Sequence, residues 1–308
     1  MKVLITGVAG FIGANLAERL IDRGYSVVGI DDLSQGIIGN VPRSVDFHQA
    51  DILEANIERY FEGVDVVFHL AAKNDIGACE KDPDETRRVN VDGTHNVVQA
   101  CFNVRKIVIA SSSAVYEQHD ILPSTEKMHP YARSAYARSK QTIEEKAWEW
   151  DRGLWPTPKI TLLRYFNVYG KYQDIRRENP PVMSAFIQAM MQKKKPVIYG
   201  DGTQRRDFIH VDDINTFHEL CIMQGAPPVV NLGSGSNHSM NGLLHLCGCR
   251  SRPEYREGRK KETHSTLADI TLAKTVGNWS PKISIEEGIR RMVDWFHIMK
   301  IGDSANDS

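Results

Sequence analysis

The sequence has few of the features that mark specialised classes of protein. Its 308 residues include 38 basic and 39 acidic side chains, so no excess of positive charge indicates binding to nucleic acid or to an anionic membrane. No uninterrupted apolar run approaches the roughly 18 residues that a membrane span needs. The N-terminal residues MKVLITG predict a strand and do not resemble a signal peptide. These absences predict a soluble globular protein.

Cysteine is scarce, and the five residues are Cys79, Cys101, Cys221, Cys247 and Cys249. An odd number without regular spacing is not typical of a disulfide framework, so we expect a reducing cytoplasm as the location. Cys247 and Cys249 form a C-x-C pair without a second pair of ligands nearby. Because a structural zinc site needs four ligands, the sequence predicts no metal centre.

What the sequence does contain is a regular alternation of strand and helix patterns. Short apolar runs begin near residues 2, 26, 46, 64, 106 and 160, and helical spacing occupies the segments near 11–24, 53–61, 83–103 and 134–150. Nearly continuous apolar strands separated by helices are typical of a parallel sheet covered on both faces. We therefore predict an α/β fold with a Rossmann-type doubly wound parallel sheet.

A glycine-rich turn, ITGVAGFIG, joins the first predicted strand to the first helix. Glycine there permits a tight turn, close approach of a pyrophosphate and close helix packing, and the helix N-terminus favours phosphate. Asp31 ends the second strand, 18 residues after Gly13, close to the spacing of an acid that binds ribose hydroxyls. A carboxylate without an adjacent arginine would repel a 2′-phosphate, which favours NAD over NADP. The alternative is that Asp31 and Asp32 only begin a turn, and Asp51 beside the adenine is a weaker candidate for the same reason.

After about residue 170 the pattern loosens into short elements with glycine and proline between them. We predict an NAD-binding domain over residues 1–170, with some later segments returning to it. A smaller mixed α/β substrate lobe is expected over 171–300 and a flexible tail over 301–308.

The segment SAYARSK places Tyr136 and Lys140 four residues apart on a predicted helix. Positions i and i+4 share one face, so both side chains can reach the same cleft. Lowering the pKa of a phenol from about 10 to near 7 takes about 4 kcal/mol, which a lysine and a positively charged nicotinamide ring could supply. The segment SSSAVY ends the preceding strand and adds a hydroxyl. The alternative is a surface helix with one aromatic residue in the core.

From about Lys2 to Phe296 the chain resembles the extended short-chain dehydrogenase/reductase family, in its NAD-dependent nucleotide-sugar epimerase/dehydratase branch. The resemblance rests on the segments TGVAGFIG, DDLSQG, HLAA, SSSAVY, YARSK, RYFNVYG, GDGTQRRDFIHVDD, NLGSG and SIEEGIRRMVDWF. It implies that Tyr136 is the catalytic base, that Lys140 binds the nicotinamide ribose, and that Ser112 binds the reacting sugar hydroxyl.

The resemblance also implies the binding sites. At the cofactor it places Gly7, Gly10, Phe11, Ile12, Gly13, Asp31, Asp32, Asp51, Ile52, Leu70, Ala71, Ala72, Asn90, Ser111, Tyr136, Lys140 and Tyr165. At a nucleotide-sugar substrate it places Lys73, Ser112, Ser113, Tyr136, Asn167, Val182, Arg206, Arg259, Glu262 and Thr266. Arg206 and Arg259 would bind the diphosphate, since a guanidinium group suits phosphate oxygens, and a solvated surface charge is the alternative for each.

Within this branch the residues favour C4 epimerisation of a UDP-sugar. Related dehydratases carry acids at the positions of Ser113 and Ala114, and related decarboxylases carry a glutamate at Ala114. Thr266 falls where hexose-only epimerases have a bulky tyrosine, so UDP-N-acetylglucosamine/UDP-N-acetylgalactosamine stands beside UDP-glucose/UDP-galactose. The alternatives are a dehydratase or decarboxylase, including one for UDP-uronic acids, a non-sugar NAD-dependent alcohol dehydrogenase, and a non-catalytic NAD-sensing module.

Several residues depart from the family pattern. Glu117 stands where the family usually has glycine after VY, and could alter substrate approach. Lys73 and Asn74 follow HLAA, where a cation could bind an added carboxylate or only cap a helix. The helices near 82–102 and 134–150 pair family members into dimers, so we expect a homodimer, although packing on their own sheet also explains their apolar faces.

Overall fold

The computed structural model describes residues 1–153, 158–175, 180–258 and 263–306, with the backbone alone for 151–153 and 299–306. Its centre is a seven-stranded sheet in the order β10-β6-β5-β4-β1-β2-β3, and every neighbouring pair is parallel. The strands are β1 (Lys2–Thr6), β2 (Ser26–Asp31), β3 (Asp46–Gln49), β4 (Val66–His69), β5 (Lys106–Ser112), β6 (Lys159–Tyr165) and β10 (Val229–Leu232). The predicted Rossmann-type sheet is confirmed.

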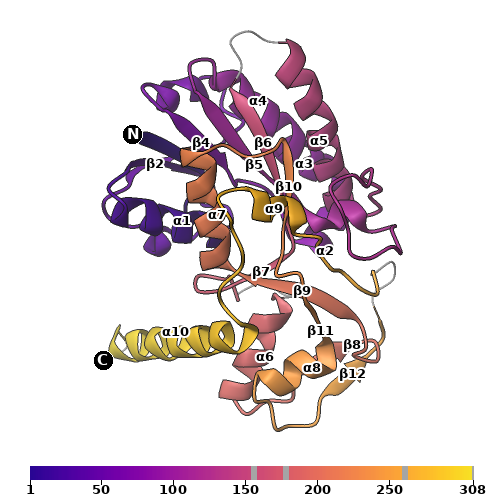
Figure 1. The fold of residues 1–308 in the computed structure, drawn as a ribbon. Coiled ribbons are helices and arrows are strands. Elements are labelled where there is room, and N and C mark those ends of the chain that lie inside the picture. Colours follow the sequence, from indigo (N-terminus) through magenta and orange to yellow (C-terminus); the bar gives the residue numbers. More distant parts are fainter. Residues whose placement is uncertain (154–157, 176–179, 259–262, 307–308) are drawn as a thin grey trace.

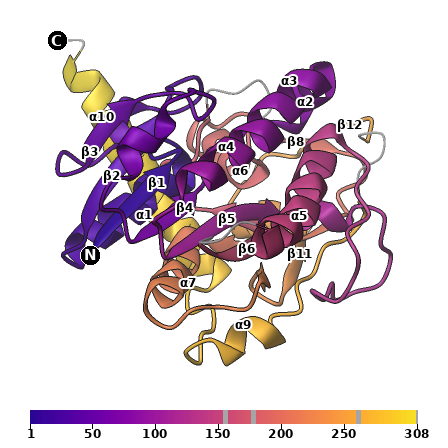
Figure 2. The same ribbon diagram turned by 90° about the horizontal axis from the view of Figure 1, so that it is seen from above.

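Helices cover both faces of this sheet (Figures 1 and 2). On one face lie α1 (Phe11–Asp22), α7 (Val211–Met223) and α9 (Thr271–Thr275), whose apolar residues, such as Leu16 and Phe217, share one core with the strands. On the other face α4 (Gly93–Ala100) and α5 (Ala135–Gly153) bury Val97 and Ile143 in a second core. The central strands are therefore apolar on both sides, as their sequences predict.

Two of the predicted helices differ in the structure. The segment expected to be helical near 53–61 contains only a short 3-10 turn, η2 (Ile57–Phe61). The long helix expected over 83–103 is instead α3 (Pro83–Arg87), a π-helical turn η3 (Arg88–Asp92) and α4, and it follows a separate helix, α2 (Ile76–Lys81). π-turns inside helices frequently lie at functional sites, because the extra residue redirects side chains.

The second lobe lies below the carboxyl ends of the strands in Figure 1. It contains the three-stranded sheet β11-β9-β7 and the pair β12-β8. Around them pack α6, α8 and α10, which bury Phe186, Leu243 and Met292. The bounds are β7 (Asn167–Tyr169), β8 (Val197–Tyr199), β9 (Arg205–His210), β11 (Asn237–Ser239), β12 (Glu254–Arg256), α6 (Val182–Met191), α8 (Met240–Leu246) and α10 (Ile285–Asn306).

The chain passes between the two lobes more than once. After β9 it returns to the large sheet through α7 and β10, and α9 packs beside β10. Conversely β7, which precedes residue 170, pairs with β9 in the second lobe. The segment expected to be a flexible tail, residues 301–308, begins inside α10, which continues to Asn306, and its flexibility stays a prediction.

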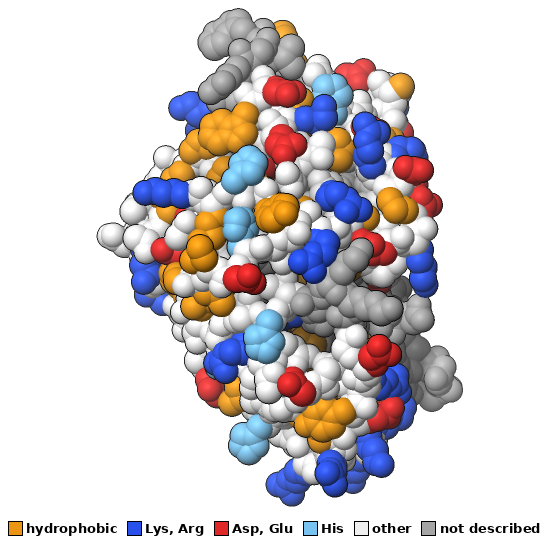
Figure 3. Space-filling view, turned by 90° about the vertical axis from the view of Figure 1, so that its right-hand side faces the viewer, with side chains coloured by type: hydrophobic (Ala, Val, Ile, Leu, Met, Phe, Trp, Pro, Cys, Tyr) orange, Lys and Arg blue, Asp and Glu red, His pale blue; other side chains and the backbone are white. Residues whose placement is uncertain are grey.

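Acidic and basic side chains are interspersed over much of the face in Figure 3, with Lys and Arg gathered at its lower end.

Among the described helices, none has the length and apolar content to cross a membrane. The described residues also contain no group of three or more His, Cys, Asp or Glu side chains placed to hold a metal ion.

Candidate active site

A cavity of about 540 Å³ opens at the carboxyl ends of the strands of the large sheet, and Val168 of β7 and Pro181 before α6 line it from the second lobe. Ligands of open α/β sheets bind at this edge. The cavity brings together nearly all the residues predicted at the cofactor: Gly7, Gly10, Phe11, Ile12, Gly13, Asp31, Asp32, Asp51, Ile52, Leu70, Ala71, Ala72, Ser111, Tyr136, Lys140 and Tyr165.

The glycine turn between β1 and α1 is packed too closely for any side chain. Gly7 has φ of +74°, and a Cβ there would lie 2.7 Å from the backbone nitrogen of Ala71. A Cβ on Gly13 would lie 2.2 Å from the carbonyl oxygen of Gly7. No side chain at Gly7 or Gly13 therefore covers the backbone before and at the start of α1, which allows the close approach of a pyrophosphate.

Substituting Gly13→Ala should leave the purified protein with little bound NAD, because the methyl group would push the turn out of place. Nucleotide released from the denatured protein by acid and quantified by chromatography measures this occupancy. Gly39→Ala is a matched control, since a Cβ there meets no atom within 4 Å. Full NAD occupancy in the Gly13 variant would contradict this account of the turn.

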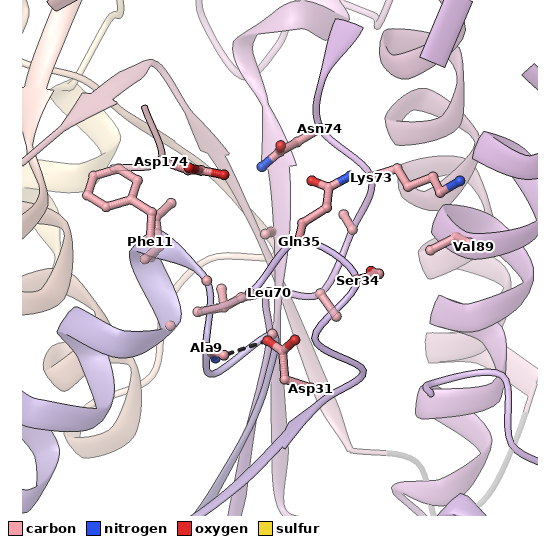
Figure 4. Close-up of a pocket in the computed structure, with 18 of the residues that line it drawn as sticks. Ala9, Phe11, Asp31, Ser34, Gln35, Leu70, Lys73, Asn74, Val89 and Asp174 are labelled. Carbon is pink, nitrogen blue, oxygen red and sulfur yellow. Dashed lines mark hydrogen bonds between the residues drawn. The ribbon is translucent and has the colours of Figure 1, made fainter. Parts of the chain in front are cut away.

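Asp31, at the end of β2, lines the same cavity as the glycine turn, and only 7% of its surface is exposed. Its Oδ2 accepts a hydrogen bond from the N–H of Ala9 at 2.9 Å, as Figure 4 shows, and its Oδ1 accepts from the N–H of Leu33 at 2.9 Å. Burial raises the pKa of Asp31, while these two hydrogen bonds lower it. The carboxylate is thus fixed by the glycine turn and by Leu33, and its expected contact with ribose hydroxyls stays a prediction.

Tyr136 and Lys140 line the other end of the cavity together with Ser112. Tyr136 is the second residue of α5, and the Nζ of Lys140 lies 5.9 Å from the centre of its ring. The ammonium group of Lys140 donates to the carbonyl oxygen of Ala110 at 2.8 Å, which holds it against the end of β5. The structure therefore assembles the predicted catalytic set from β5 and α5.

In the chain without its cofactor, the pKa of Tyr136 lies above that of a free phenol. Burial raises the pKa of Tyr136 to about 12, and a hydrogen bond with Ser112 lowers it only in part. Burial also lowers the pKa of Lys140 to about 8, although the neighbouring Cys79 and Glu144 raise it. The expected lowering of the phenol pKa depends on Lys140 together with a positively charged nicotinamide ring, and in the chain alone burial outweighs the groups that lower it. Most of the lowering therefore has to come from a bound positive charge.

Asn90 does not line the cavity, contrary to its expected contact with the cofactor. It is fully buried in the π-turn η3, where its Oδ1 accepts from the N–H of Lys73 at 2.8 Å and its Nδ2 donates to the carbonyl oxygen of Lys73 at 3.0 Å. Its Nδ2 also donates to the hydroxyl of Ser139 at 3.0 Å. Asn90 thus joins the loop after β4 to the catalytic helix α5.

A buried histidine continues this network toward β1. His69 bonds Thr6 Oγ1 at 2.7 Å through Nδ1 and Thr94 Oγ1 at 2.8 Å through Nε2, and Thr94 donates to the carbonyl oxygen of Asn90 at 2.5 Å. Burial, followed by the charge of Lys140, lowers the pKa of His69 to about 3. His69 is therefore neutral at physiological pH.

Folding stability should fall between pH 7 and pH 5, because the unfolded chain binds protons at His69 that the folded chain does not. A folded pKa of about 3 against 6.5 gives a loss of about 2 kcal/mol at pH 5 from this group. Urea unfolding at both pH values measures the difference, and His69→Gln should reduce it. An unchanged pH dependence in that variant would contradict the assignment.

A second buried network connects α5 to the ends of the neighbouring strands β5 and β6. Arg164 on β6 pairs with Glu144 on α5 at 2.5 Å, and each side chain is only 3% exposed. The hydroxyl of Ser111 donates to Glu144 Oε1 at 2.5 Å, and Arg164 donates to the hydroxyl of Tyr116, which donates to Asn231 Oδ1 at 2.8 Å. The network ties α5 to the ends of β5, β6 and β10, and so fixes the catalytic helix on the sheet.

The structure separates the residues predicted at the substrate. Lys73 lines the cavity, but its Nζ lies 3.4 Å from Glu85 Oε1, and Figure 4 shows it extending toward the segment that carries Val89. Four others form no part of the lining: Ser113, Val182, Arg206 and Thr266. Arg259 and Glu262 lie outside the described residues.

Asn167 does not line the cavity either, but it forms one cluster with the C-terminal segment near β9. Its Nδ2 donates to the carbonyl oxygen of Asp207 at 3.0 Å and to Thr266 Oγ1 at 3.5 Å. Arg206 donates to the carbonyl oxygen of His264 at 3.2 Å, and Thr266 Oγ1 accepts from the N–H of Asp207 at 3.2 Å. The structure thus brings Asn167, Arg206 and Thr266 together, but outside the cavity wall.

Sequence reasoning missed part of the cavity wall. The loop after β2 contributes Ser34, Gln35 and Gly36, which the segment DDLSQG could have indicated, and Ile37 and Asn40, which follow that segment. Asn74, already noted after the segment HLAA, lies at the end farther from Asp31 (Figure 4). That end also includes Asp174, with Tyr172, Gln173 and Pro181 in the lining, and the sequence did not indicate these four. No local pattern marks these residues, because they belong to loops of irregular structure.

Comparison with known proteins is consistent with this geometry. Residues 3–233 match the family described as "NAD dependent epimerase/dehydratase family". The chain belongs to this family. It is also similar to the UDP-glucose 4-epimerase of Thermotoga maritima solved with UDP-glucose, at 32% identity and a TM-score of 0.93, with 97% of this chain and 99% of that chain covered.

Two further solved family members differ in their sugars. One is the UDP-N-acetylglucosamine 4-epimerase of Methanobrevibacter ruminantium in complex with UDP-N-acetylmuramic acid, at 30% identity, a TM-score of 0.91 and coverage of 97% and 98%. The other is the UDP-glucuronic acid 4-epimerase of Bacillus cereus with UDP-glucuronic acid and NAD, at 28% identity, a TM-score of 0.87 and coverage of 97% and 100%. NAD is accordingly the cofactor, and the protein is an enzyme of the epimerase/dehydratase type. The expected homodimer stays a prediction.

Proposed function

We propose that the protein interconverts UDP-sugars that differ in configuration at C4, by way of a 4-keto sugar. The observation that supports this most is the convergence of Tyr136, Lys140 and Ser112 at one end of a cavity whose other end holds Asp31 and the glycine turn. These residues join a proton acceptor to a dinucleotide site.

In this proposal each residue has a separate task. The Tyr136 phenolate takes the proton from the C4 hydroxyl, and the Ser112 hydroxyl holds the reacting oxygen. Lys140, fixed by the carbonyl oxygen of Ala110, keeps an ammonium group beside the phenol. When bound, NAD supplies a hydride acceptor and donor and, in its oxidised form, the positive charge that the pKa of Tyr136 requires.

Related dehydratases and decarboxylases carry the acids for elimination of water or loss of carbon dioxide in the turn that follows the catalytic serine. The 3-10 turn η4 (Ser113–Tyr116), which follows Ser112, offers only Ser113 and Ala114 at the relevant positions. The nearby carboxylate of Glu117 already accepts three hydrogen bonds. Epimerisation, which needs no acid in this turn, is therefore favoured over dehydration and decarboxylation.

The charges of the cavity favour a neutral sugar over a uronic acid. Lys73, the cation expected to bind a sugar carboxylate, is paired with Glu85. Asp174 adds a negative charge to the cavity end away from Asp31. We therefore propose UDP-glucose/UDP-galactose or the corresponding N-acetyl sugars as substrates, with Asn167, Arg206 and Thr266 as candidate contacts from the second lobe.

Proton NMR of the purified protein with UDP-glucose, UDP-N-acetylglucosamine and UDP-glucuronate in turn, without added cofactor, tests this function. A new anomeric signal at constant mass with a neutral sugar is the expected result. Loss of water or carbon dioxide, or conversion of UDP-glucuronate alone, would overturn the proposal in favour of the corresponding alternative.

A further inference from the structure

The carboxylate of Glu117 binds the start of the catalytic helix. Its Oε2 accepts hydrogen bonds from the N–H groups of Arg133 at 2.9 Å and Ser134 at 2.8 Å, and its Oε1 accepts from the hydroxyl of Ser134 at 2.7 Å. The same hydroxyl oxygen accepts from the N–H of Ala137 at 3.2 Å. Glu117 therefore satisfies donors at the N-terminus of α5, where a negative charge is also favoured by the helix dipole.

Backbone hydrogen bonds hold the segments on either side of Glu117 and Ser134 together. The N–H of Tyr131 donates to the carbonyl oxygen of Val115 at 2.7 Å, and the N–H of Gln118 donates to that of Tyr131 at 3.3 Å. The side chain of Gln118 donates to the carbonyl oxygen of Ala132 at 3.1 Å. Residues 115–118 and 131–134 thus form one connected clamp. Glu117 bonds the start of α5, and the N–H of Ala132 adds a contact to Gln141 on α5 at 3.1 Å.

The clamp joins the two elements that carry the proposed catalytic residues. Ser112 ends β5, five residues before Glu117, and Tyr136 lies two residues after Ser134. We propose that Glu117 is a positioning residue that sets the placement of Tyr136 relative to Ser112. This inference rests on the proposed function, which assigns the proton transfer to these two hydroxyl groups.

The clamp also reaches the second lobe. The hydroxyl of Thr263 donates to the backbone carbonyl oxygen of Glu117 at 3.1 Å, and Thr263 leads directly into the segment that contains Thr266. The segment that bonds Asn167 and Arg206 is therefore connected to the start of α5 through Glu117. A residue at this junction can align the substrate lobe with the catalytic helix.

Glu117 acts on Tyr136 through its negative charge as well as through its hydrogen bonds to the start of α5. The groups that act electrostatically with the phenol are Cys79 on α2, Glu117, Lys140 on α5 and Tyr165 on β6. Burial is the main cause of the raised pKa of Tyr136, and the charges of Cys79 and Glu117 raise it further. Removing the charge of Glu117 should therefore lower the pKa of Tyr136.

A second carboxylate, that of Glu80 on α2, bonds the same end of α5 and provides a matched control. The Oε1 of Glu80 on α2 accepts from the N–H of Ala135 at 2.5 Å, but Glu80 is not among the groups that shift the pKa of Tyr136. A Glu80→Gln substitution keeps an acceptor for that N–H. The Glu80→Gln variant should show the same pH dependence of turnover as the wild type.

Kinetics of Glu117→Ala, Glu117→Gln and Glu80→Gln test the inference. Glu117→Ala should lower kcat by roughly 10- to 100-fold with a much smaller change in KM, since misplacement by about 1 Å costs up to about 100-fold. Glu117→Gln keeps an acceptor and should recover most of kcat, while the acidic limb of its pH profile moves to lower pH. Wild-type kcat and pH profile in both Glu117 variants would overturn the inference.

Amide hydrogen exchange separates this inference from the proposed function. If the wild-type protein converts no UDP-sugar, the proposed function fails, and exchange at Arg133 and Ser134 becomes the deciding readout. Faster exchange in Glu117→Ala than in Glu80→Gln supports the clamp. Equal exchange in the wild type and Glu117→Ala overturns it.

Discussion

Replacing Tyr136 by phenylalanine should abolish conversion of UDP-sugars while leaving NAD and nucleotide-sugar binding largely intact. The substitution removes only the phenolic oxygen, at the cavity end that also holds Ser112 and Lys140. General base catalysis alone contributes about 100- to 10,000-fold to rate, so turnover should fall at least that far. Steady-state kinetics with isothermal titration of the nucleotide-sugar measures both effects.

Tyr255→Phe is the control for this substitution. Tyr255 lies on β12 with about half of its surface exposed, and its hydroxyl donates to Asn241 at 3.1 Å, away from the cavity lining. This variant should retain wild-type turnover. If Tyr136→Phe also retained it, the assignment of the catalytic base would be wrong.

Replacing Arg164 by methionine should destabilise the fold by about 3–5 kcal/mol. Removing one partner of a buried ion pair leaves the other charge buried without compensation, and Glu144 is only 3% exposed. The hydroxyl of Tyr116 would also lose the hydrogen bond that Arg164 donates. Chemical denaturation at neutral pH measures the free energy of unfolding.

Two further variants serve as comparisons for the stability of Arg164→Met. Arg290→Met removes exposed ion pairs with Glu287 and Asp294 and should cost no more than about 1 kcal/mol. Adding Glu144→Gln to Arg164→Met removes the unpaired charge and should recover part of the lost stability. A cost below about 1 kcal/mol for Arg164→Met would show that the pair does not hold α5 on the sheet.

The sequence predicts the sheet and the cofactor end of the site because their signals are local. Continuous apolar strands determine a parallel sheet, and the glycine turn with Asp31 needs only one strand–helix–strand unit. The i, i+4 spacing of Tyr136 and Lys140 likewise depends on one helix.

What the sequence could not predict depends on register and on burial. The π-turn η3 places Asn90 in the interior, and periodicity alone does not reveal such a turn. The pairing of Arg164 with Glu144 joins β6 to α5, and that of Lys73 with Glu85 joins a loop to α3. The raised pKa of Tyr136 reflects desolvation, which only the folded structure defines.

The central claim is that C4 of the sugar loses and regains its own hydrogen within one active site. The most direct measurement uses a UDP-sugar carrying deuterium at C4, with no cofactor added and the product analysed by NMR and mass spectrometry. The account predicts a C4 epimer of unchanged mass that retains the deuterium at C4. An epimer that has lost the label to solvent, or a product lighter by water or carbon dioxide, would contradict it.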